Sequence, residues 1–250
     1  MARLIGSPIE DLDTPALMLD GPAMERNVRR MADFFRDRSC RLRPHFKNHK
    51  CTELARRQLD AGSAVGITCA KLGEAEVLAD AGFQDVLIAN QVVGPPKMER
   101  LIDVARRMDN LRVAVDHIDQ AQAISEAAAP AGVTVGVLVE VDIGMGRCGV
   151  VPGRPALEQA RRVAALKGLR FDGLQAYEGH LVDVPDVDER RRRTHEAMQL
   201  AIDTRQLIEE AGIPTTSRAL SHLYEFQNLV HYRQLEDLAT KMGILQRATA

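Results

Sequence analysis

The chain has 250 residues, of which 45% are hydrophobic, so it is long enough to bury the core of one domain. Its net charge is −2 with acids and bases interspersed, and only 4% of its residues are aromatic, which argues against a nucleic-acid or membrane partner. No apolar run approaches the roughly 18 residues that span a bilayer, and four cysteines without CxxC spacing exclude a disulfide framework. With no recognisable signal peptide, a reducing cytoplasm is the expected location.

Short apolar stretches alternate with amphipathic stretches along most of the chain. The expected strands are 14–20, 42–46, 65–70, 85–90, 111–116, 133–141 and 171–177. The expected helices begin at residue 21 and then cover 51–61, 72–81, 95–108, 118–129, 155–166 and 188–211. In the first helix, Met24, Val28, Met31 and Phe34 or Phe35 recur at helical spacing, which predicts that they belong to the core rather than to a site.

About seven strand–helix units therefore follow one another. Apolar strands that alternate with helices pair in parallel and are covered by helices on the outside. The repeat count favours a (β/α)8 barrel of the TIM type over a doubly wound sheet, and the Gly-x-Gly-x-x-Gly pattern of dinucleotide-binding folds is absent. In such a barrel the chemistry lies at the C-terminal ends of the strands. Those ends are rich in polar residues here.

One polar strand end centres on a lysine. Around Lys47, the residues Arg43, His45 and His49 alternate with apolar neighbours that are expected to be buried. Neighbouring positive charge and partial desolvation favour the neutral amine, which is the form that attacks a carbonyl carbon. The alternative is a basic surface strand that binds phosphate or faces water.

Two further strand ends carry candidate site residues. The stretch Asp142–Gly149 contains three glycines that allow a tight turn, and it holds Arg147 as a donor for an anionic oxygen. The stretch Gln175–Leu181 places a phenol, a carboxylate and an imidazole together. A lysine, an arginine and a tyrosine at three strand ends require a partner that all of them can contact.

The motifs around these residues resemble a known family. Arg43–Lys50, Cys69–Glu76, Asp142–Gly149 and Tyr177–His180 together are similar to motifs of the D-threonine aldolase and D-serine dehydratase group. Those proteins are pyridoxal-phosphate enzymes with the fold of the alanine racemase N-terminal domain. The resemblance covers roughly residues 11–214 and implies the same barrel and the same cofactor.

The resemblance also implies roles for individual residues. Lys47 matches the lysine that bonds covalently to the cofactor aldehyde and then serves as general base. Arg147 matches the arginine that donates to the phenolic oxygen of the cofactor, and Tyr177 matches the residue near the pyridine nitrogen. Alanine racemases have an arginine at the last position, so the tyrosine favours the aldolase and dehydratase branch. His45 is either a hydrogen-bond partner at the cofactor site or a packing residue, and His180 either acts on the substrate hydroxyl or is structural.

The implied activity is that of a lyase that cleaves a D-3-hydroxy amino acid to glycine and an aldehyde. D-Serine dehydration, racemisation and an inactive remnant are the alternatives. Intact family members use a divalent metal of the manganese or zinc class, whose ligands are not expected in this chain. The expected partner is a small D-amino acid, and a homodimer is a candidate assembly.

The resemblance stops near Thr215. Family members continue into a glycine-rich loop that cradles the cofactor phosphate and then into a C-terminal β-domain with the metal ligands. Here 215–226 contains no glycine, and 224–245 has the apolar periodicity of a helix. The sequence therefore predicts a cofactor-binding barrel over 1–214, incomplete at its C-terminal end, and a helical tail over 215–250. Either the chain is a truncated copy of a longer enzyme, or the tail helix covers the open edge of the barrel.

Overall fold

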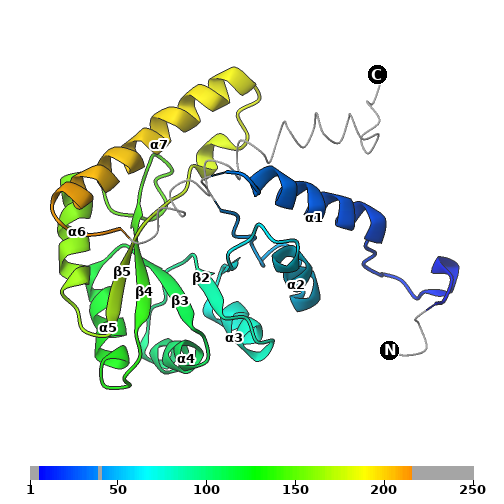
Figure 1. The fold of residues 1–250 in the computed structure, drawn as a ribbon, viewed down its shortest axis with the longest axis horizontal. Coiled ribbons are helices and arrows are strands. Elements are labelled where there is room, and N and C mark those ends of the chain that lie inside the picture. Colours follow the sequence, from blue (N-terminus) through cyan, green and yellow to red (C-terminus); the bar gives the residue numbers. More distant parts are fainter. Residues whose placement is uncertain (1–5, 39–40, 216–250) are drawn as a thin grey trace.

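The computed structural model describes residues 6–38 and 41–215, and the predicted tail lies outside the described residues. Within them, five strands form one sheet: β1 (Ile67–Cys69), β2 (Asp85–Ile88), β3 (Asn110–Val115), β4 (Val135–Val141) and β5 (Leu169–Ala176). The helices are α1 (Gly21–Phe35), α2 (Thr52–Asp60), α3 (Leu72–Asp80), α4 (Pro95–Arg106), α5 (Ile118–Ala128), α6 (Arg154–Ala164) and α7 (Val187–Glu210), and two short 3-10 turns are η1 (Ile9–Asp11) and η2 (Gly179–Leu181). Figure 1 shows helices α3 to α6 following one another around the outside of the sheet.

The strands are all parallel, and their order in the sheet is their order in the chain. A doubly wound sheet would reverse its order at a switch point, so this topology confirms the prediction of a barrel-type fold. Among the described residues β1 and β5 each have a named strand on one side only, so the barrel is incomplete within them.

Burial explains why the strands and helices form where the sequence predicts them. All seven residues of β4 are buried, as expected of a parallel strand that is covered on both faces. Helix α7 begins where the Asp186 side chain accepts a hydrogen bond from the Glu189 backbone N–H at 2.8 Å.

The helices of the described ranges are too short or too polar to cross a membrane.

The lysine stretch is only partly the strand that its sequence predicts. It makes two parallel bridges to the chain around β1, Leu42 with Ala64 and His45 with Thr68, and then turns over 46–49. Pro44 has no N–H to donate, which keeps the pairing short. The segment 42–45 nevertheless lies beside β1 as an additional short edge of the barrel.

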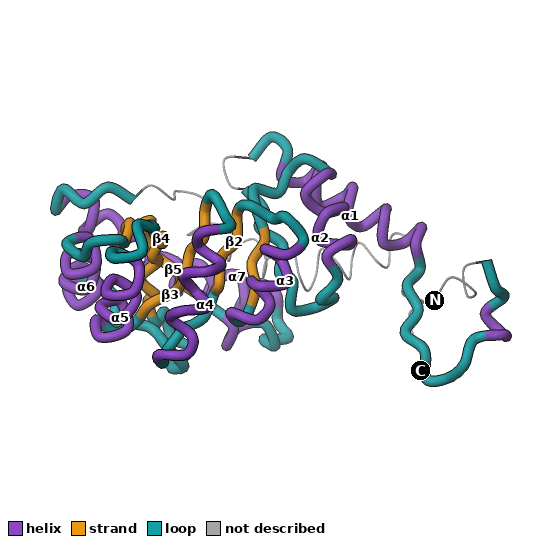
Figure 2. The backbone as a smooth tube through the Cα atoms, turned by 90° about the horizontal axis from the view of Figure 1, so that it is seen from below, coloured by secondary structure: helices purple, strands orange, loops and turns teal. Residues whose placement is uncertain are grey.

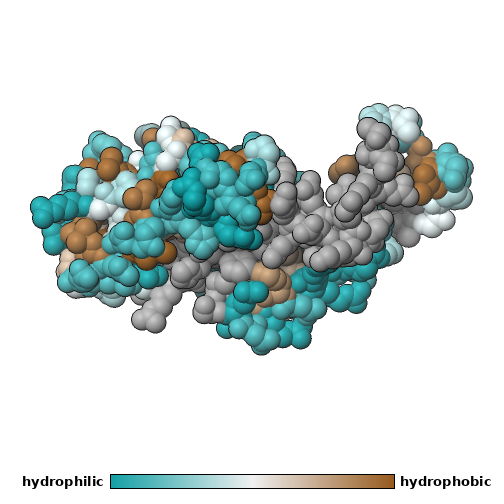
Figure 3. Space-filling view, turned by 90° about the horizontal axis from the view of Figure 1, so that it is seen from above, coloured by the Kyte–Doolittle hydropathy of each residue, from teal (hydrophilic) through white to brown (hydrophobic). Residues whose placement is uncertain are grey.

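The prediction of a strand over 14–20 is wrong. These residues form no bridge, and Leu17, Met18 and Leu19 are exposed. Figure 2 shows this segment extending away from the sheet, and Figure 3 shows apolar residues on the same projecting part. A strand needs a neighbour to satisfy its backbone groups, and no described residue pairs with this segment.

Helix α1 forms as predicted, but only the C-terminal end of its apolar stripe, at Phe35, is core. Its buried residues are Ala32 and Phe35, whereas Met24, Val28 and Met31 are only half-buried. The reason is that α1 packs against α2 and lies beside the end of the sheet rather than across it (Figure 1).

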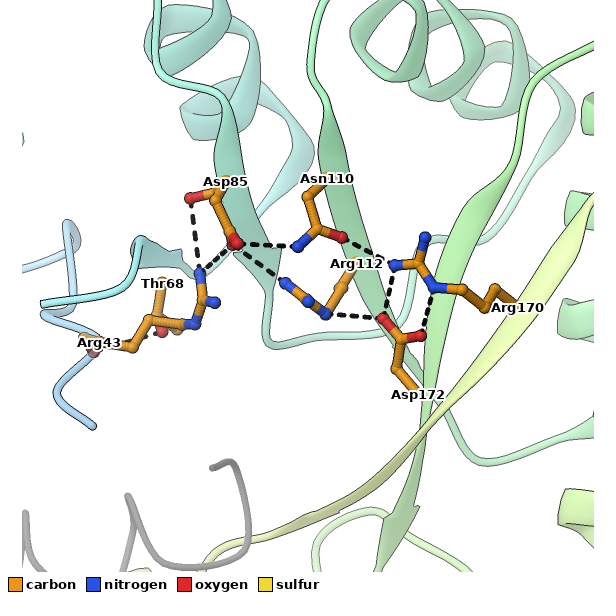
Figure 4. A network of polar contacts seen from close by, with 7 residues as sticks. All are labelled: Arg43, Thr68, Asp85, Asn110, Arg112, Arg170 and Asp172. Atoms are coloured by element: carbon orange, nitrogen blue, oxygen red, sulfur yellow. Dashed lines mark hydrogen bonds and ion pairs between the residues drawn. The ribbon is translucent and has the colours of Figure 1, made fainter. Parts of the chain in front are cut away.

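The interior of the barrel carries an ionic layer near the N-terminal ends of the strands (Figure 4). Arg112 of β3 contacts two carboxylates, Asp85 of β2 at 3.0 Å and Asp172 of β5 at 2.7 Å. Arg43 also pairs with Asp85, and Arg170 also pairs with Asp172, both at 2.5 Å. Three guanidinium groups and two carboxylates therefore neutralise much of one another's charge inside the sheet.

Two glycines provide the space for this layer. A Cβ added at Gly66 would lie 2.2 Å from Nη1 of Arg43, and one added at Gly136 would lie 2.6 Å from Oδ2 of Asp172. Neither glycine has a positive φ. Both positions therefore require glycine for room rather than for backbone freedom.

Candidate active site

A cavity of about 770 Å³ lies along the lysine segment and reaches the C-terminal ends of the strands. Its lining comes from the lysine segment, from α1 and α2, from the residues before and after β1, from those after β2, from the end of β5 and from the two loops after β4 and β5. Four of the five predicted site residues line it, namely Lys47, His45, Arg147 and Tyr177. The structure thus brings together residues that are up to 132 positions apart in the sequence.

Lys47 sits in the turn that follows the bridged part of its segment. The turn is anchored by Phe46, which is buried and whose backbone N–H donates to the carbonyl oxygen of Thr68 at 2.7 Å. The backbone N–H of Lys47 donates to Nδ1 of His45 at 3.2 Å. Burial, with the charge of Lys47 as a second cause, lowers the pKa of His45 to about 4. The imidazole is therefore neutral at pH 7, and its Nδ1 is an acceptor that supports the turn.

His49 also supports this turn rather than the cavity chemistry. Its Nδ1 accepts the backbone N–H of Cys51 at 3.1 Å, so its Nε2 carries the proton that faces Oε1 of Gln58 at 3.2 Å. The ring also meets Phe46 edge-on, with 5.5 Å between centroids. Both ring nitrogens of His49 are therefore committed to structural contacts.

The prediction that Arg43 belongs to the cluster around Lys47 is wrong. Arg43 is buried in the ionic layer, where it pairs with Asp85. Four residues of extended chain span about 13 Å. Arg43 and Lys47 therefore lie at opposite ends of the segment, although the alternating pattern places them on one face.

Arg147 is held by a loop whose turns match the glycine pattern. The Asp142 carboxylate accepts the backbone N–H groups of Gly144 and Gly146, each at 3.0 Å. Desolvation opposes ionisation of Asp142, but the N–H groups of Gly146 and Gly144 outweigh it and lower the carboxyl pKa. Gly149 has φ of 108°, and an added Cβ there would lie 2.5 Å from the backbone nitrogen of Asp142. The loop therefore requires glycine at this position.

Tyr177 follows directly after β5 and faces Arg147. The guanidinium carbon of Arg147 lies 5.3 Å from the centroid of the Tyr177 ring, which is within the range of a cation–π contact. A Cβ added at Gly179 would lie 2.3 Å from Cε1 of Tyr177, so Gly179 gives the ring its place. The arginine and the phenol are thus positioned by two loops that each depend on a glycine.

His180 is the candidate that the structure separates from the others. It is exposed on η2, beside Gly144, and it is not part of the cavity lining. Burial and the charge of Arg193 lower its pKa, while Asp142 opposes them. The imidazole is therefore weighted toward its neutral form, which can accept a proton.

Glu140 is a site residue that the sequence reasoning missed. It is only 4% exposed on β4, it accepts a hydrogen bond from Nε2 of Gln91 at 2.6 Å, and it faces Gln175 across the β4–β5 register. Burial raises its pKa, opposed by hydrogen bonds from Gln91 and Gln175 and by the charge of Arg147. The sequence does contain a signal for Glu140, because it is the one charged residue in the most apolar strand.

Comparisons with known proteins agree with this geometry. The chain matches the family described as alanine racemase, N-terminal domain, over residues 19–233. It is 41% identical to a D-threonine aldolase of Arthrobacter sp. over 83% of this chain and 54% of that protein, and 34% identical to a 3-hydroxy-D-aspartate aldolase of Paracoccus denitrificans over 84% and 54%. The chain therefore spans about half the length of the curated relatives it matches.

Solved structures give the same result. The crystal structure of D-threonine aldolase from Filomicrobium marinum matches with a TM-score of 0.82 and 43% identity, over 87% of this chain and 61% of that one. D-threo-3-hydroxyaspartate dehydratase from Delftia sp. HT23 matches with a TM-score of 0.75 and 30% identity, over 82% and 54%.

Proposed function

Because the chain belongs to the alanine racemase N-terminal domain family, we propose that it is a pyridoxal-phosphate-dependent lyase that cleaves D-3-hydroxy amino acids to glycine and an aldehyde. The observation that carries the proposal is that Lys47, Arg147 and Tyr177 line one cavity at the strand ends. Relatives named D-threonine aldolase and 3-hydroxy-D-aspartate aldolase support the substrate class.

The residues of the cavity fit the cofactor in their chemistry. Lys47 offers an amine that can condense with an aldehyde, Arg147 offers a permanent positive charge for the phenolate oxygen, and Tyr177 offers a polar ring. Gln175 adds a buried amide to the same lining. When bound, the cofactor supplies an electron-withdrawing ring that stabilises negative charge at the substrate Cα.

The protein's own groups provide proton transfer and orientation. Lys47 would hold the cofactor through its amine, and the same amine could take up or return a proton near the substrate Cα. His180 lies outside the cavity lining, so its role as acceptor of the substrate hydroxyl proton rests on the family resemblance; the C–O electron pair left by that proton forms the aldehyde as the Cα–Cβ bond breaks. Glu140 and Arg147 line the same small space, and a carboxylate at Glu140 favours the charged guanidinium of Arg147. In the described part of the chain, no three metal-ligating side chains come together.

The test is cofactor binding to the full chain. Purified protein mixed with pyridoxal phosphate should develop the absorbance of a lysine-bound cofactor, and borohydride reduction should fix the label on Lys47. Lys47→Ala should abolish both signals. Lys71→Ala, which removes an exposed lysine outside the cavity lining, should leave both unchanged. A folded wild-type protein that shows no band would overturn the proposal and favour an inactive remnant.

Dehydration is the second candidate, because the chain is also similar to D-threo-3-hydroxyaspartate dehydratase. Products separate the two reactions. Cleavage of D-threonine yields glycine, whereas dehydration of D-serine yields pyruvate. Glycine without pyruvate is the result expected of an aldolase.

A further inference from the structure

Arg43 reaches across a neighbouring strand to make its ion pair. Its side chain starts on the lysine segment and passes over Gly66, the residue before β1. It ends at Asp85 of β2 (Figure 4). Nη1 donates to Oδ1 of Asp85 at 2.5 Å and to the Asp85 carbonyl oxygen at 3.4 Å. The passage exists because Gly66 has no side chain, since a Cβ there would lie 2.2 Å from Nη1.

Arg43 is a surplus charge in the ionic layer. Arg112 and Arg170 already supply two guanidinium groups for the two carboxylates, Asp85 and Asp172. Arg43 adds a third cation, which is 4% exposed. Its burial, ahead of every other cause, lowers its pKa, and its Nε has no hydrogen-bond partner among the described residues. Charge balance therefore does not account for this buried cation, whose desolvation is costly.

The segment that carries Arg43 lacks the support that the other strands have. It pairs with the chain around β1 on one side, through Leu42 and His45, and no described strand lies on its other side. On the helix-facing side Phe46 belongs to the main apolar core. On the interior side Arg43 provides the fixed contact, and it connects the segment to β2 in addition to β1. Lys47 follows four residues later.

We propose that Arg43 is a positioning residue for Lys47: its tether to Asp85, through the opening at Gly66, fixes the segment so that the Lys47 amine points into the cavity. This inference rests on the proposed function, in which Lys47 bonds to the cofactor aldehyde. Arg43 itself touches neither substrate nor cofactor.

The experiment measures how fast Lys47 reacts. The full chain is mixed with pyridoxal phosphate and quenched with borohydride at timed intervals. The Lys47 amine and the aldehyde of the probe lose water to form a C=N bond, which hydride from borohydride reduces to a stable secondary amine. The labelled Lys47 peptide is counted by mass spectrometry. A thermal melt of each variant sets a temperature at which all are folded.

Two variants break the tether by different routes. Arg43→Met removes the cation and leaves two guanidinium groups for two carboxylates, so the layer stays balanced and the protein is expected to fold. Gly66→Ala keeps Arg43 but places a Cβ in its passage, and that Cβ would also lie 2.6 Å from the carbonyl oxygen of Asp85. Both should slow labelling of Lys47 by about 10- to 100-fold, the size of effect that misplacement by about 1 Å produces. Arg43→Lys keeps a charge of similar reach and should restore most of the rate.

Arg170→Met is the matched control, because Arg170 belongs to the same layer but is anchored on β5. It should label Lys47 within about twofold of the wild type. If Arg43→Met and Gly66→Ala label as fast as the wild type, or if Arg170→Met slows labelling equally, the inference is wrong. If Arg43→Met does not fold, Gly66→Ala decides. An unlabelled wild type would instead overturn the proposed function, so the two failures are distinguishable.

Discussion

The two ends of the barrel interior use charge in opposite ways. At the N-terminal end, Arg43, Arg112 and Arg170 are paired with Asp85 and Asp172. At the C-terminal end, the charged groups of the predicted site face a cavity of about 770 Å³ instead of one another. Strands β4 and β5 contribute residues both to the ionic layer and to the cavity end.

Neighbouring positions on single strands show the difference most clearly. On β5, Asp172 is held by two arginines, whereas Gln175 lies three residues further and lines the cavity. On β4, Gly136 leaves room for the ionic layer, whereas Glu140 lines a small space together with Arg147. A parallel barrel therefore separates stability from chemistry along the strand direction. Apart from Arg43, whose tether is proposed to position Lys47, substitutions in the ionic layer should mainly change the free energy of unfolding, and substitutions at the cavity end should mainly change reactivity.

The largest effect on stability is expected from Asp172→Ala. Asp172 is 1% exposed and pairs with both Arg112 and Arg170, so its removal leaves the buried Arg43, the largely buried Arg112 and the exposed Arg170 with one carboxylate. We expect the free energy of unfolding, measured by urea denaturation, to fall by about 3–5 kcal/mol. Asp188→Ala removes an exposed carboxylate that pairs with Arg191 on α7, and it should cost less than about 0.5 kcal/mol. Equal losses in the two variants would contradict the distinction between buried layer and surface.

A smaller effect is expected from Gly136→Ala. The new Cβ would lie 2.6 Å from Oδ2 of Asp172 and 2.8 Å from Cγ of Arg112, and both side chains are fixed by ion pairs. Overpacking of this kind should cost about 1–3 kcal/mol. Gly73→Ala in α3 is the control, because its nearest atoms lie 3.8 Å away and alanine favours the helix. The prediction fails if Gly136→Ala unfolds at the same urea concentration as the wild type.

The comparison also shows what the sequence could predict. The strands and helices from residue 65 onward were predictable because burial leaves a pattern in each element: helices carry apolar residues at helical spacing, and a strand covered on both faces, such as β4, is a continuous apolar run. The strand over 14–20 was not, because its residues are apolar but the choice of a pairing neighbour is not encoded locally. An apolar pattern predicts that a segment can form a strand, but it does not predict which strand pairs with it.

The site was predictable to a similar extent. Topology brings strand ends together, so Lys47, Arg147 and Tyr177 converge as the barrel requires. Arg43 was misplaced because alternation gives the face of a strand but not the depth in the barrel, and its partner Asp85 lies 42 residues away. Glu140 was missed because its amide partners are far away in sequence: Gln91 is 49 residues away, and Gln175 becomes its neighbour only across the β4–β5 register.

The smallest expected effect is a pH dependence of stability that arises from His45, at the cavity end of the barrel. The pKa of His45 is about 4 in the folded protein, below the ordinary value of about 6.5, so the unfolded chain binds the proton more readily. Stability should therefore fall as the pH drops from about 6.5 to 4, and the shift corresponds to about 1–2 kcal/mol once partial exposure is discounted. His45→Gln keeps an acceptor for the Lys47 backbone N–H but cannot titrate, so it should remove this part of the pH dependence. Lys47→Met removes the positive charge that is the second cause of the low His45 pKa. The pH range over which stability falls should therefore become narrower. Urea unfolding between pH 4 and 7.5 measures all three proteins, and parallel curves for the wild type and His45→Gln would show that His45 is not the titrating group.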